Sequence, residues 1–201
     1  MIVSKRKRRS SDDTSYWIGY TDLLSNTLLV LLLTVAVTAV AKASREKPPL
    51  IRLTEEQSFR FDTGSYNLSS AFTKSLDRRI PEIRDTIRRY GIDSVEVIGH
   101  TDGQPSPGLS NLDLLLPSSS RANTLHGYRV GSNTDLGLLR AIAVANYLKA
   151  KIHLGGARNI IIRPYSAGSL IAGDGRYNPA DASDRPDRRR IEIRFTRKDQ
   201  N

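Results

Sequence analysis

Residues 23–41 form the longest apolar stretch of the chain, and none of them carries a charge. As an α-helix rising about 1.5 Å per residue, a stretch of about 19 residues spans the roughly 30 Å hydrocarbon core of a membrane. Trp17 and Tyr20 precede it, where aromatic side chains commonly meet the membrane interface. The pattern predicts one transmembrane helix over residues 16–43, whose core contains as polar residues only Ser25, Asn26, Thr27, Thr34 and Thr38.

The segment before this helix is basic, with the sequence KRKRR at residues 5–9. Because positively charged flanks stay in the cytoplasm, residues 1–15 are predicted to form a cytoplasmic tail and the bulk of the chain to lie outside. One alternative is a cleaved signal peptide with a faint cleavage site at residues 41–43, and another is a buried helix of a soluble protein. A signal peptide usually has only about 7–15 apolar residues after a basic lead, whereas this lead also carries Asp12 and Asp13. The transmembrane interpretation is therefore favoured.

A polar stretch follows the apolar one. Residues 42–57 include Pro48 and Pro49, and they predict a linker over residues 44–57. Fully extended, this stretch of about 16 residues reaches at most ~58 Å. The outer part of the chain is thus expected to stay fairly close to the membrane unless it rearranges.

Strand signals begin after the linker. Phe59 and Phe61 alternate with polar neighbours, which predicts a short strand. Further strands are predicted at residues 95–99, 160–162 and 191–195, where β-branched residues are concentrated. Between them, residues 103–132 and 174–187 are polar loops, the first with an apolar patch at residues 112–116. A loop as long as the first is usually functional or disordered.

The segments between these strands have apolar residues at helical spacing. One helical face is predicted from Phe72, Leu76, Ile80, Ile83 and Ile87, with Pro81 as a kink or a fresh start. A second helix is predicted over residues 136–148, with Leu139, Ile142, Ala143 and Tyr147 facing inward. Strands alternating with helices predict an α/β domain over residues 58–196, built on a mixed sheet covered by helices and followed by a tail at residues 197–201.

Composition narrows the chemistry. The chain has no cysteine, which excludes disulfides, thiolate metal sites and cysteine nucleophiles, and its three histidines lack a metal-ligand spacing. No pattern indicates a catalytic dyad or a metal-bound water, so we predict a protein that is not an enzyme and needs no cofactor. The net charge of +10 suits nucleic acid, an anionic membrane surface or an acidic polymer such as a bacterial cell wall. Nucleic-acid binding leaves the apolar stretch unexplained, and we predict no nucleic-acid partner.

Three motifs in order carry a family resemblance. Residues 98–102 read IGHTD, residues 133–141 read NTDLGLLRA, and residues 188–193 read RRRIEI. They resemble the G-H-T-D, N-x-x-L-S-x-x-R-A and N-R-R-V-E-I elements of OmpA-like peptidoglycan-binding domains, over roughly residues 59–195. The sequence departs from the family at Gly137, where serine is common, at Arg188, which replaces asparagine, and in the long insert at residues 103–132.

The resemblance implies a pocket for diaminopimelate of the wall's stem peptide. It assigns Asp102 to the ligand ammonium and Arg140 to its carboxylate, with Thr101, Asn133 and Arg189 also at the peptidoglycan site. A zwitterion needs one fixed charge of each sign, and a guanidinium binds a carboxylate bidentately. The structural alternatives are an Asp102–Arg140 ion pair or a surface arginine on a helix. Asn133 can orient the loop or cap the helix, and Arg189, like Arg190, can line the site or be solvated.

A second resemblance lies in the membrane segment. Residues 20–25 read YTDLLS and resemble the Y-A-D-L-M-T/S element of MotB-type stator subunits, which also carry an OmpA-like domain in the same order. The resemblance implies that Asp22 binds the translocated ion, a proton or sodium. Ser25, Asn26 and Leu29 share its helical face and are predicted to line an ion path. The alternative is an interfacial Asp22, exposed to water or serving the first helical turn.

Two functions follow from these resemblances. The first is the B subunit of an ion-driven stator in a bacterial inner membrane, forming a homodimer inside a larger multi-helix, MotA-like membrane subunit and anchored to peptidoglycan. Such pairs serve flagellar rotation or, in the Zorya type, anti-phage defence, and the short linker favours the compact non-flagellar type. The second is a static membrane-tethered peptidoglycan anchor in which Asp22 has no role in transport.

Overall fold

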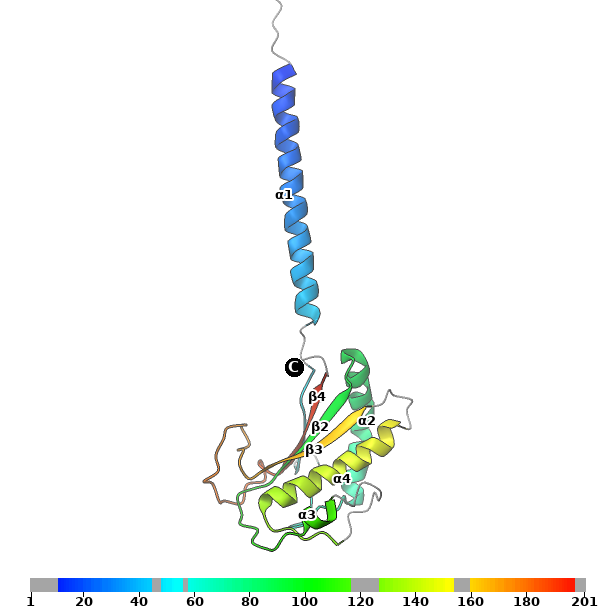
Figure 1. Ribbon diagram of the computed structural model, residues 1–201, viewed down its shortest axis with the longest axis vertical. Coiled ribbons are helices and arrows are strands. Elements are labelled where there is room, and N and C mark those ends of the chain that lie inside the picture. Colours follow the sequence, from blue (N-terminus) through cyan, green and yellow to red (C-terminus); the bar gives the residue numbers. More distant parts are fainter. Residues whose placement is uncertain (1–10, 45–47, 56–57, 117–126, 154–159, 198–201) are drawn as a thin grey trace, which may run out of the picture. The chain divides into compact units, whose positions relative to one another are not determined.

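The computed structural model describes residues 11–44, 48–55, 58–116, 127–153 and 160–197 (Figure 1). Its chain contacts divide it into two compact units, Met1–Lys47 and Pro48–Asn201. The first unit contains one helix, and the second contains the α/β domain. The basic run at residues 5–9 and the tail after residue 197 lie outside the described residues.

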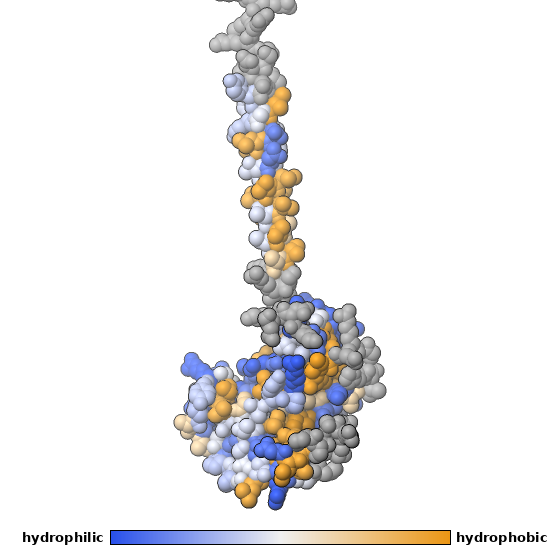
Figure 2. Space-filling view, viewed as in Figure 1, coloured by the Kyte–Doolittle hydropathy of each residue, from blue (hydrophilic) through white to orange (hydrophobic). Residues whose placement is uncertain are grey.

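The helix of the first unit, α1, runs over Ser11–Ser44. Its segment Tyr16–Ala41 is long and apolar enough to cross a membrane, and the side chains along it are exposed (Figure 2). The hydroxyls of its threonines donate to carbonyls one turn earlier, as Thr34 does to Val30, so they need no outside partner. Because α1 begins at Ser11, Asp22 lies about three turns inside it, and the interpretation that Asp22 serves the first helical turn was wrong.

The domain is built on a mixed four-stranded sheet with the order β1-β4-β2-β3. The strands are β1 (Ile51–Thr54), β2 (Ser94–His100), β3 (Ile161–Gly168) and β4 (Arg190–Thr196). Strand β2 is parallel to β3, whereas β4 is antiparallel to both β1 and β2. The helices α2 (Ser70–Tyr90) and α4 (Asn133–His153) cover one face of the sheet, as Figure 1 shows. The predicted fold, an apolar helix followed by a mixed sheet covered by helices, is confirmed.

The core lies between that sheet face and the two helices. The predicted apolar face of α2 is buried, and Pro81 lies within a single continuous helix. The Ser69 side chain accepts a hydrogen bond from the Phe72 backbone and caps the start of α2, and Gly91 ends it in the left-handed conformation at φ 60°. The strands contribute alternate residues to the same core, including Ile51, Leu53, Val95, Val97, Ile191, Ile193 and Phe195.

The predicted linker and first strand were both misplaced. Strand β1 lies within residues 44–57, where Ile51 and Leu53 face the core and the register pairs Ile51 with Ile193 of β4. Phe59 is not in a strand; like Phe61, it is buried in a loop against Phe72 of α2, with ring centroids 5.2 Å and 4.7 Å apart. The segment between α1 and β1 is therefore only residues 45–50.

Helix α4 is longer than predicted and buries more than one side. Leu139 is buried as predicted, but Ile142, Ala143 and Tyr147 are only half-buried, and Val144 and Leu148 face the main core instead. A second apolar cluster explains the shift, because Leu138 and Ile142 pack there around Leu112, Tyr128 and Leu139. Leu112 belongs to the short helix α3 (Leu112–Leu115), so the insert packs on α4 rather than forming only a polar loop.

The topology gives the domain two distinct ends. One, which we call the entry end, holds the start of β1, where the chain arrives from α1, together with the C-terminal ends of α2, α4 and β4. The other, which we call the site end, holds the end of β2, the start of β4 and the N-terminus of α4. Since β2 rises about 3.3 Å per residue, the two ends lie roughly 20 Å apart.

Candidate functional site

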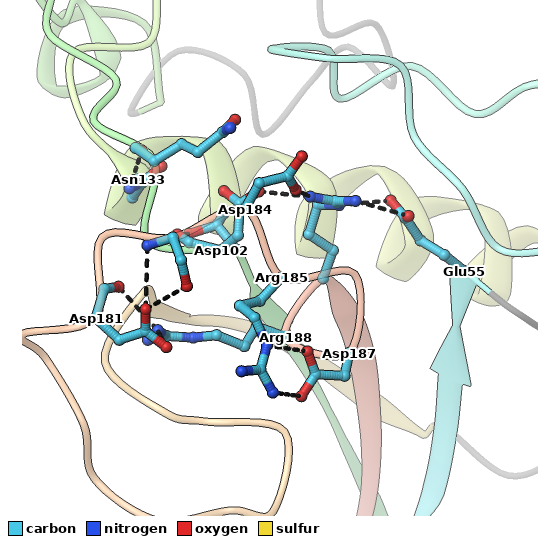
Figure 3. Close-up of polar contacts among 12 residues, drawn as sticks. Glu55, Asp102, Asn133, Asp181, Asp184, Arg185, Asp187 and Arg188 are labelled. Carbon is cyan, nitrogen blue, oxygen red and sulfur yellow. Dashed lines mark hydrogen bonds and ion pairs between the residues drawn. The ribbon is translucent and has the colours of Figure 1, made fainter.

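Predicted site residues from three separate segments meet at the site end (Figure 3). Asp102 lies two residues beyond the end of β2, Arg189 directly precedes β4, and Asn133 is the first residue of α4. Glu55, which follows β1 directly, joins them. The sheet register thus brings side chains distant in sequence to one edge, where the strands β1, β4 and β2 are neighbours.

Two glycines allow α4 to approach the end of β2 closely. A Cβ atom on Gly99 would lie 2.0 Å from the Gly137 carbonyl oxygen, and one on Gly137 would lie 2.5 Å from Ser166 Oγ. Neither position has room for a side chain without movement of the backbone or of Ser166. The departure from serine at Gly137 therefore has a packing reason, and it brings the first turns of α4 against the strand that ends at Asp102.

Arg189 is held by three carboxylates. Its Nη1 donates to Asp102 Oδ2 at 2.6 Å and also to Asp184, while Nε and Nη2 donate to the two oxygens of Glu55 at 2.8 Å and 3.1 Å. Hydrogen bonding to Glu55 is the main reason that the pKa of Arg189 lies above its usual value. Arg189 is therefore not a solvated surface arginine, and it occupies one oxygen of the Asp102 carboxylate.

Arg140 is buried, with 4% of its surface exposed, and it has no ion-pair partner in the described part of the chain. Its Nε donates to the Ser65 carbonyl at 2.9 Å and its Nη2 to the Asp62 carbonyl at 3.3 Å, with the guanidinium 4.7 Å from the centre of the Phe61 ring. Burial lowers the pKa of Arg140 to about 10, against the attraction of Asp102 and Glu55. The side chain stays charged at neutral pH.

This arrangement matches neither structural alternative for Asp102 and Arg140. They form no direct ion pair, and Arg140 does not lie on the surface. Asp102 is also buried, with 8% of its surface exposed. The site end therefore holds two buried, opposite charges that attract each other without touching.

Asn133 and Thr101 have local roles in the structure. Ser132 caps α4, because its Oγ accepts a hydrogen bond from the Asp135 backbone at 3.2 Å. Asn133 instead donates to the Gln104 carbonyl at 2.8 Å and so orients the loop after β2. Thr101 is buried, its backbone amide donates to the Gly168 carbonyl, and its hydroxyl donates to the Asp102 carbonyl. Both residues fix the backbone that carries Asp102.

Several residues of this site were not predicted from the sequence. Glu55 falls inside the segment predicted as a linker, and Asp184 falls in a polar loop without a recognisable motif. Arg188 is 1% exposed, pairs with Asp181 at 3.0 Å, and donates to the carbonyls of Asp181, Ser169 and Asn178. These contacts hold the loop between β3 and β4 in place next to the site. Arginine suits this role because its long side chain ends in several N–H donors.

A second charged cluster lies on the sheet face opposite the helices. Glu192 is buried there and contacts Arg190 and Arg194 at 3.0 Å, with Arg52 at 3.6 Å and His100 Nε2 at 3.7 Å. Arg190 is buried beside Glu192 on this face of the sheet, so it is not a solvated side chain and it does not line the candidate site. Burial raises the pKa of Glu192, but contact with His100 and hydrogen bonds from Arg190 and Arg194 outweigh burial and hold that pKa well below its usual value.

Replacing Glu192 with glutamine is expected to destabilise the domain by about 3 kcal/mol at pH 7, because the buried Arg190 loses its carboxylate partner. A carboxyl group with a lowered pKa in the folded state stabilises above its unfolded pKa, here about 4.5, and loses this effect as the pH falls further. The difference between the parent and the variant should therefore shrink below pH 4.5. Urea unfolding of the full chain in detergent, followed by circular dichroism, measures it. As a control, Glu82→Gln breaks the exposed pair with Arg79 and should change the free energy of unfolding by less than about 1 kcal/mol. A Glu192→Gln destabilisation that stays the same at all pH values would contradict the prediction.

No protein-family model and no curated protein matches the chain. Among solved structures, it is similar to the periplasmic domain of Helicobacter pylori MotB, at 18% identity over 78% of this chain and 80% of that one, with a TM-score of 0.47. It is also similar to the cell wall anchor of the T6SS from Pseudomonas aeruginosa (23% identity, 74% and 81% covered, TM-score 0.43). A third is the OmpA-like domain of FopA1 from Francisella tularensis (20% identity, 73% of each chain, TM-score 0.38). These are similarities of fold, and the site itself is defined by the side chains of this chain.

Proposed function

We propose that this chain is a membrane-anchored peptidoglycan-binding protein and the B subunit of an ion-driven stator of the bacterial inner membrane. Its α1 helix spans the membrane with the N-terminus in the cytoplasm, and the α/β domain lies in the periplasm. Asp102 and Arg140 bind the diaminopimelate of a stem peptide, and Asp22 binds the transported ion. The chain acts as a homodimer within a multi-helix membrane subunit.

The observation that carries the wall-binding part is that Arg140 is buried and has no ion-pair partner among the described residues. A buried guanidinium without a carboxylate is costly, and a ligand carboxylate is the group that would neutralise it. Asp102 accepts a hydrogen bond from Arg189 at Oδ2, and among the described residues no donor bonds to its Oδ1, which we assign to the ammonium group. A ligand with one free ammonium and one free carboxylate satisfies both residues, and the side-chain end of diaminopimelate has this chemistry.

The arrangement of the domain supports an anchoring role. The chain enters from α1 at the entry end, and the candidate site lies at the opposite end of the sheet. A domain tethered at one end and binding at the other can bridge its tether and a polymer without blocking its own site. The connecting segment of six residues, 45–50, spans at most about 22 Å.

Asp22 supports the motor part of the proposal. It is the only charged residue between Tyr16 and Ala41, and Asn26 Nδ2 donates to its Oδ1 at 3.3 Å on the same helical face as Ser25. A charge at the centre of a membrane span costs about 2.5–3.5 kcal/mol by insertion scales, and charged residues within spans tend to be functional. One helix encloses no channel, which is why partner helices are part of the proposal. The short connection favours a compact, Zorya-like anti-phage system over a flagellar motor.

A static peptidoglycan anchor is the second candidate. The candidate site supports the static anchor as well as it supports the stator, because wall binding through Asp102 and Arg140 requires no ion transport. The two candidates differ only in the role of Asp22, so wall binding and ion flux have to be measured separately.

Sedimentation of the detergent-solubilised full chain with purified peptidoglycan tests the wall-binding part. Free diaminopimelate at millimolar concentration should release the protein from the wall, because it offers both charged groups. Cadaverine has the two ammonium groups of diaminopimelate but no carboxylate, and it should release far less. Equal release by both compounds, or by neither, would contradict a site that recognises a zwitterion through Arg140.

A further inference from the structure

The entry end of the domain carries a concentration of cations that the proposed function does not use. They come from the last turns of two helices and the end of the last strand, and all are exposed or half-exposed: Arg88, Arg89, Lys149, Lys151, Arg194 and Arg197. We call this surface the entry-end basic patch. The topology gathers it, because α2, α4 and β4 all end where β1 begins.

Internal ion pairs do not neutralise the patch. Arg88 pairs with Asp85, Lys151 with Asp77 and Arg194 with Glu192. Arg197 Nε donates to the Tyr90 carbonyl, which brings the end of β4 against the end of α2 and leaves the charge of Arg197 in place. In the described part of the chain, neither Arg89 nor Lys149 forms an ion pair, so the patch retains net positive charge.

More carboxylates gather at the opposite end, whereas Asp85 and Asp93 lie near the ends of α2 and β2 that border the patch. Glu55, Asp102, Asp181, Asp184 and Asp187 gather at the site end, where they pair with Arg185, Arg188 and Arg189. The domain is therefore electrically polar along its strands. At the end where the chain arrives from α1, the exposed cations Arg89 and Lys149 have no ion-pair partner in the described part of the chain.

Helix dipoles explain only part of this asymmetry. Cations near a helix C-terminus interact favourably with the partial negative charge there, and this accounts for basic residues in the last turns of α2 and α4. Arg194 and Arg197 belong to a strand end and gain nothing from that interaction. The dipole also acts within one turn, whereas the patch joins three elements into one surface.

The short segment between α1 and the domain indicates which partner this surface can contact. The six residues 45–50 span at most about 22 Å, and they add one net positive charge, from Arg45 and Lys47 against Glu46. If α1 spans the membrane, as the proposed function requires, the entry end is held near the headgroups at the end of α1. Anionic headgroups attract basic surfaces within about a Debye length, ~8 Å at physiological salt.

We propose that the entry-end basic patch docks on anionic phospholipid headgroups of the membrane that α1 spans. The docking holds the domain with its site end directed away from the bilayer. It rests on the proposed function, because a chain that does not span a membrane has no bilayer beside this surface.

Site-specific labels on the full chain in vesicles test the docking. The chain has no native cysteine, so single cysteines can be introduced at Ala150, exposed near the end of α4, and at Ala71, exposed near the start of α2. Quenching of a fluorophore by headgroup-labelled lipid is compared in vesicles of phosphatidylcholine alone and with about a third phosphatidylglycerol. The label at Ala150 should be quenched more strongly with phosphatidylglycerol and released by high salt, while the label at Ala71 should not respond.

Charge variants make the comparison specific. Arg89→Gln with Lys149→Gln should lower the ratio of docked to undocked domain about 25-fold, since each cation near an anionic surface contributes about fivefold. Lys74→Gln with Arg129→Gln removes two exposed cations from the site-bearing half and should leave the ratio unchanged. Equal quenching at both positions in both lipids, or an equal loss in both double variants, would overturn the docking.

Alkaline extraction separates this proposal from the proposed function. A chain that stays in the membrane pellet at high pH but shows no lipid-dependent quenching contradicts the docking alone. A chain extracted into the supernatant contradicts the transmembrane helix, and with it both proposals. Neither double variant touches Asp102 or Arg140, so peptidoglycan sedimentation should be the same for both.

Discussion

Replacing Arg140 with lysine is expected to weaken binding of the full chain to peptidoglycan about 30-fold, although the charge is kept. The guanidinium bonds to the carbonyls of Ser65 and Asp62 and lies against the Phe61 ring. A lysine ammonium is a single compact donor group, so it cannot keep this position and also grip a ligand carboxylate from two sides. Loss of a buried charged contact costs about 2 kcal/mol or more, which corresponds to about 30-fold in Kd. Sedimentation with purified peptidoglycan over a range of wall concentrations measures the change.

Ligand discrimination separates this effect from simple destabilisation. Walls whose stem peptides contain lysine instead of diaminopimelate lack one carboxylate, so the parent should prefer the diaminopimelate wall. Arg140→Lys should lose this preference, whereas Arg129→Lys, in the exposed part of the insert, should keep both affinity and preference. Thermal unfolding of each variant shows whether it is folded. A folded Arg140→Lys protein that binds and discriminates like the parent would remove Arg140 from the site.

The helical pattern of α2 and the runs of β-branched residues in β2, β3 and β4 predicted their elements correctly, whereas the shortest alternating patterns did not. The helical spacing of α2 repeats over several turns, so its buried face is specified by five apolar positions. Strand β1 has only Ile51 and Leu53 as inward positions, and it forms because it pairs with β4, a contact far away in sequence. Phe59 and Phe61 show the same alternation but gain their burial from Phe72, without a neighbouring strand.

The candidate site was predictable as a set of motifs, but its internal contacts were not. The motifs indicated Asp102, Arg140 and Arg189, and the register of β2 and β4 brings Asp102 and Arg189 to one end of the sheet. The bond between Arg189 and Glu55 joins residues 134 positions apart, and no local pattern records it. Tertiary contacts also decide that Arg140 bonds to backbone carbonyls rather than to Asp102.

Replacing Asp22 with asparagine is expected to abolish ion flux through the complex of this chain with the multi-helix membrane subunit that we propose as its partner. Asparagine has nearly the shape of aspartate, but it cannot take up and release a proton or neutralise a bound cation. No other residue between Tyr16 and Ala41 can replace this function, because none carries a charge. Flux is measured in vesicles containing the co-expressed complex, with peptidoglycan present, and assembly of the complex is verified by co-purification.

Two matched variants show whether the loss belongs to the carboxylate. Asp22→Glu keeps an ionisable group on the same helical face and should retain part of the flux. Thr34→Val removes a polar group from the same span, but its hydroxyl already bonds to the Val30 carbonyl within α1, so flux should persist. Unchanged flux in an assembled Asp22→Asn complex would exclude the stator. It would leave the static anchor, because binding through Asp102 and Arg140 depends on the α/β domain alone and should survive every change made in α1.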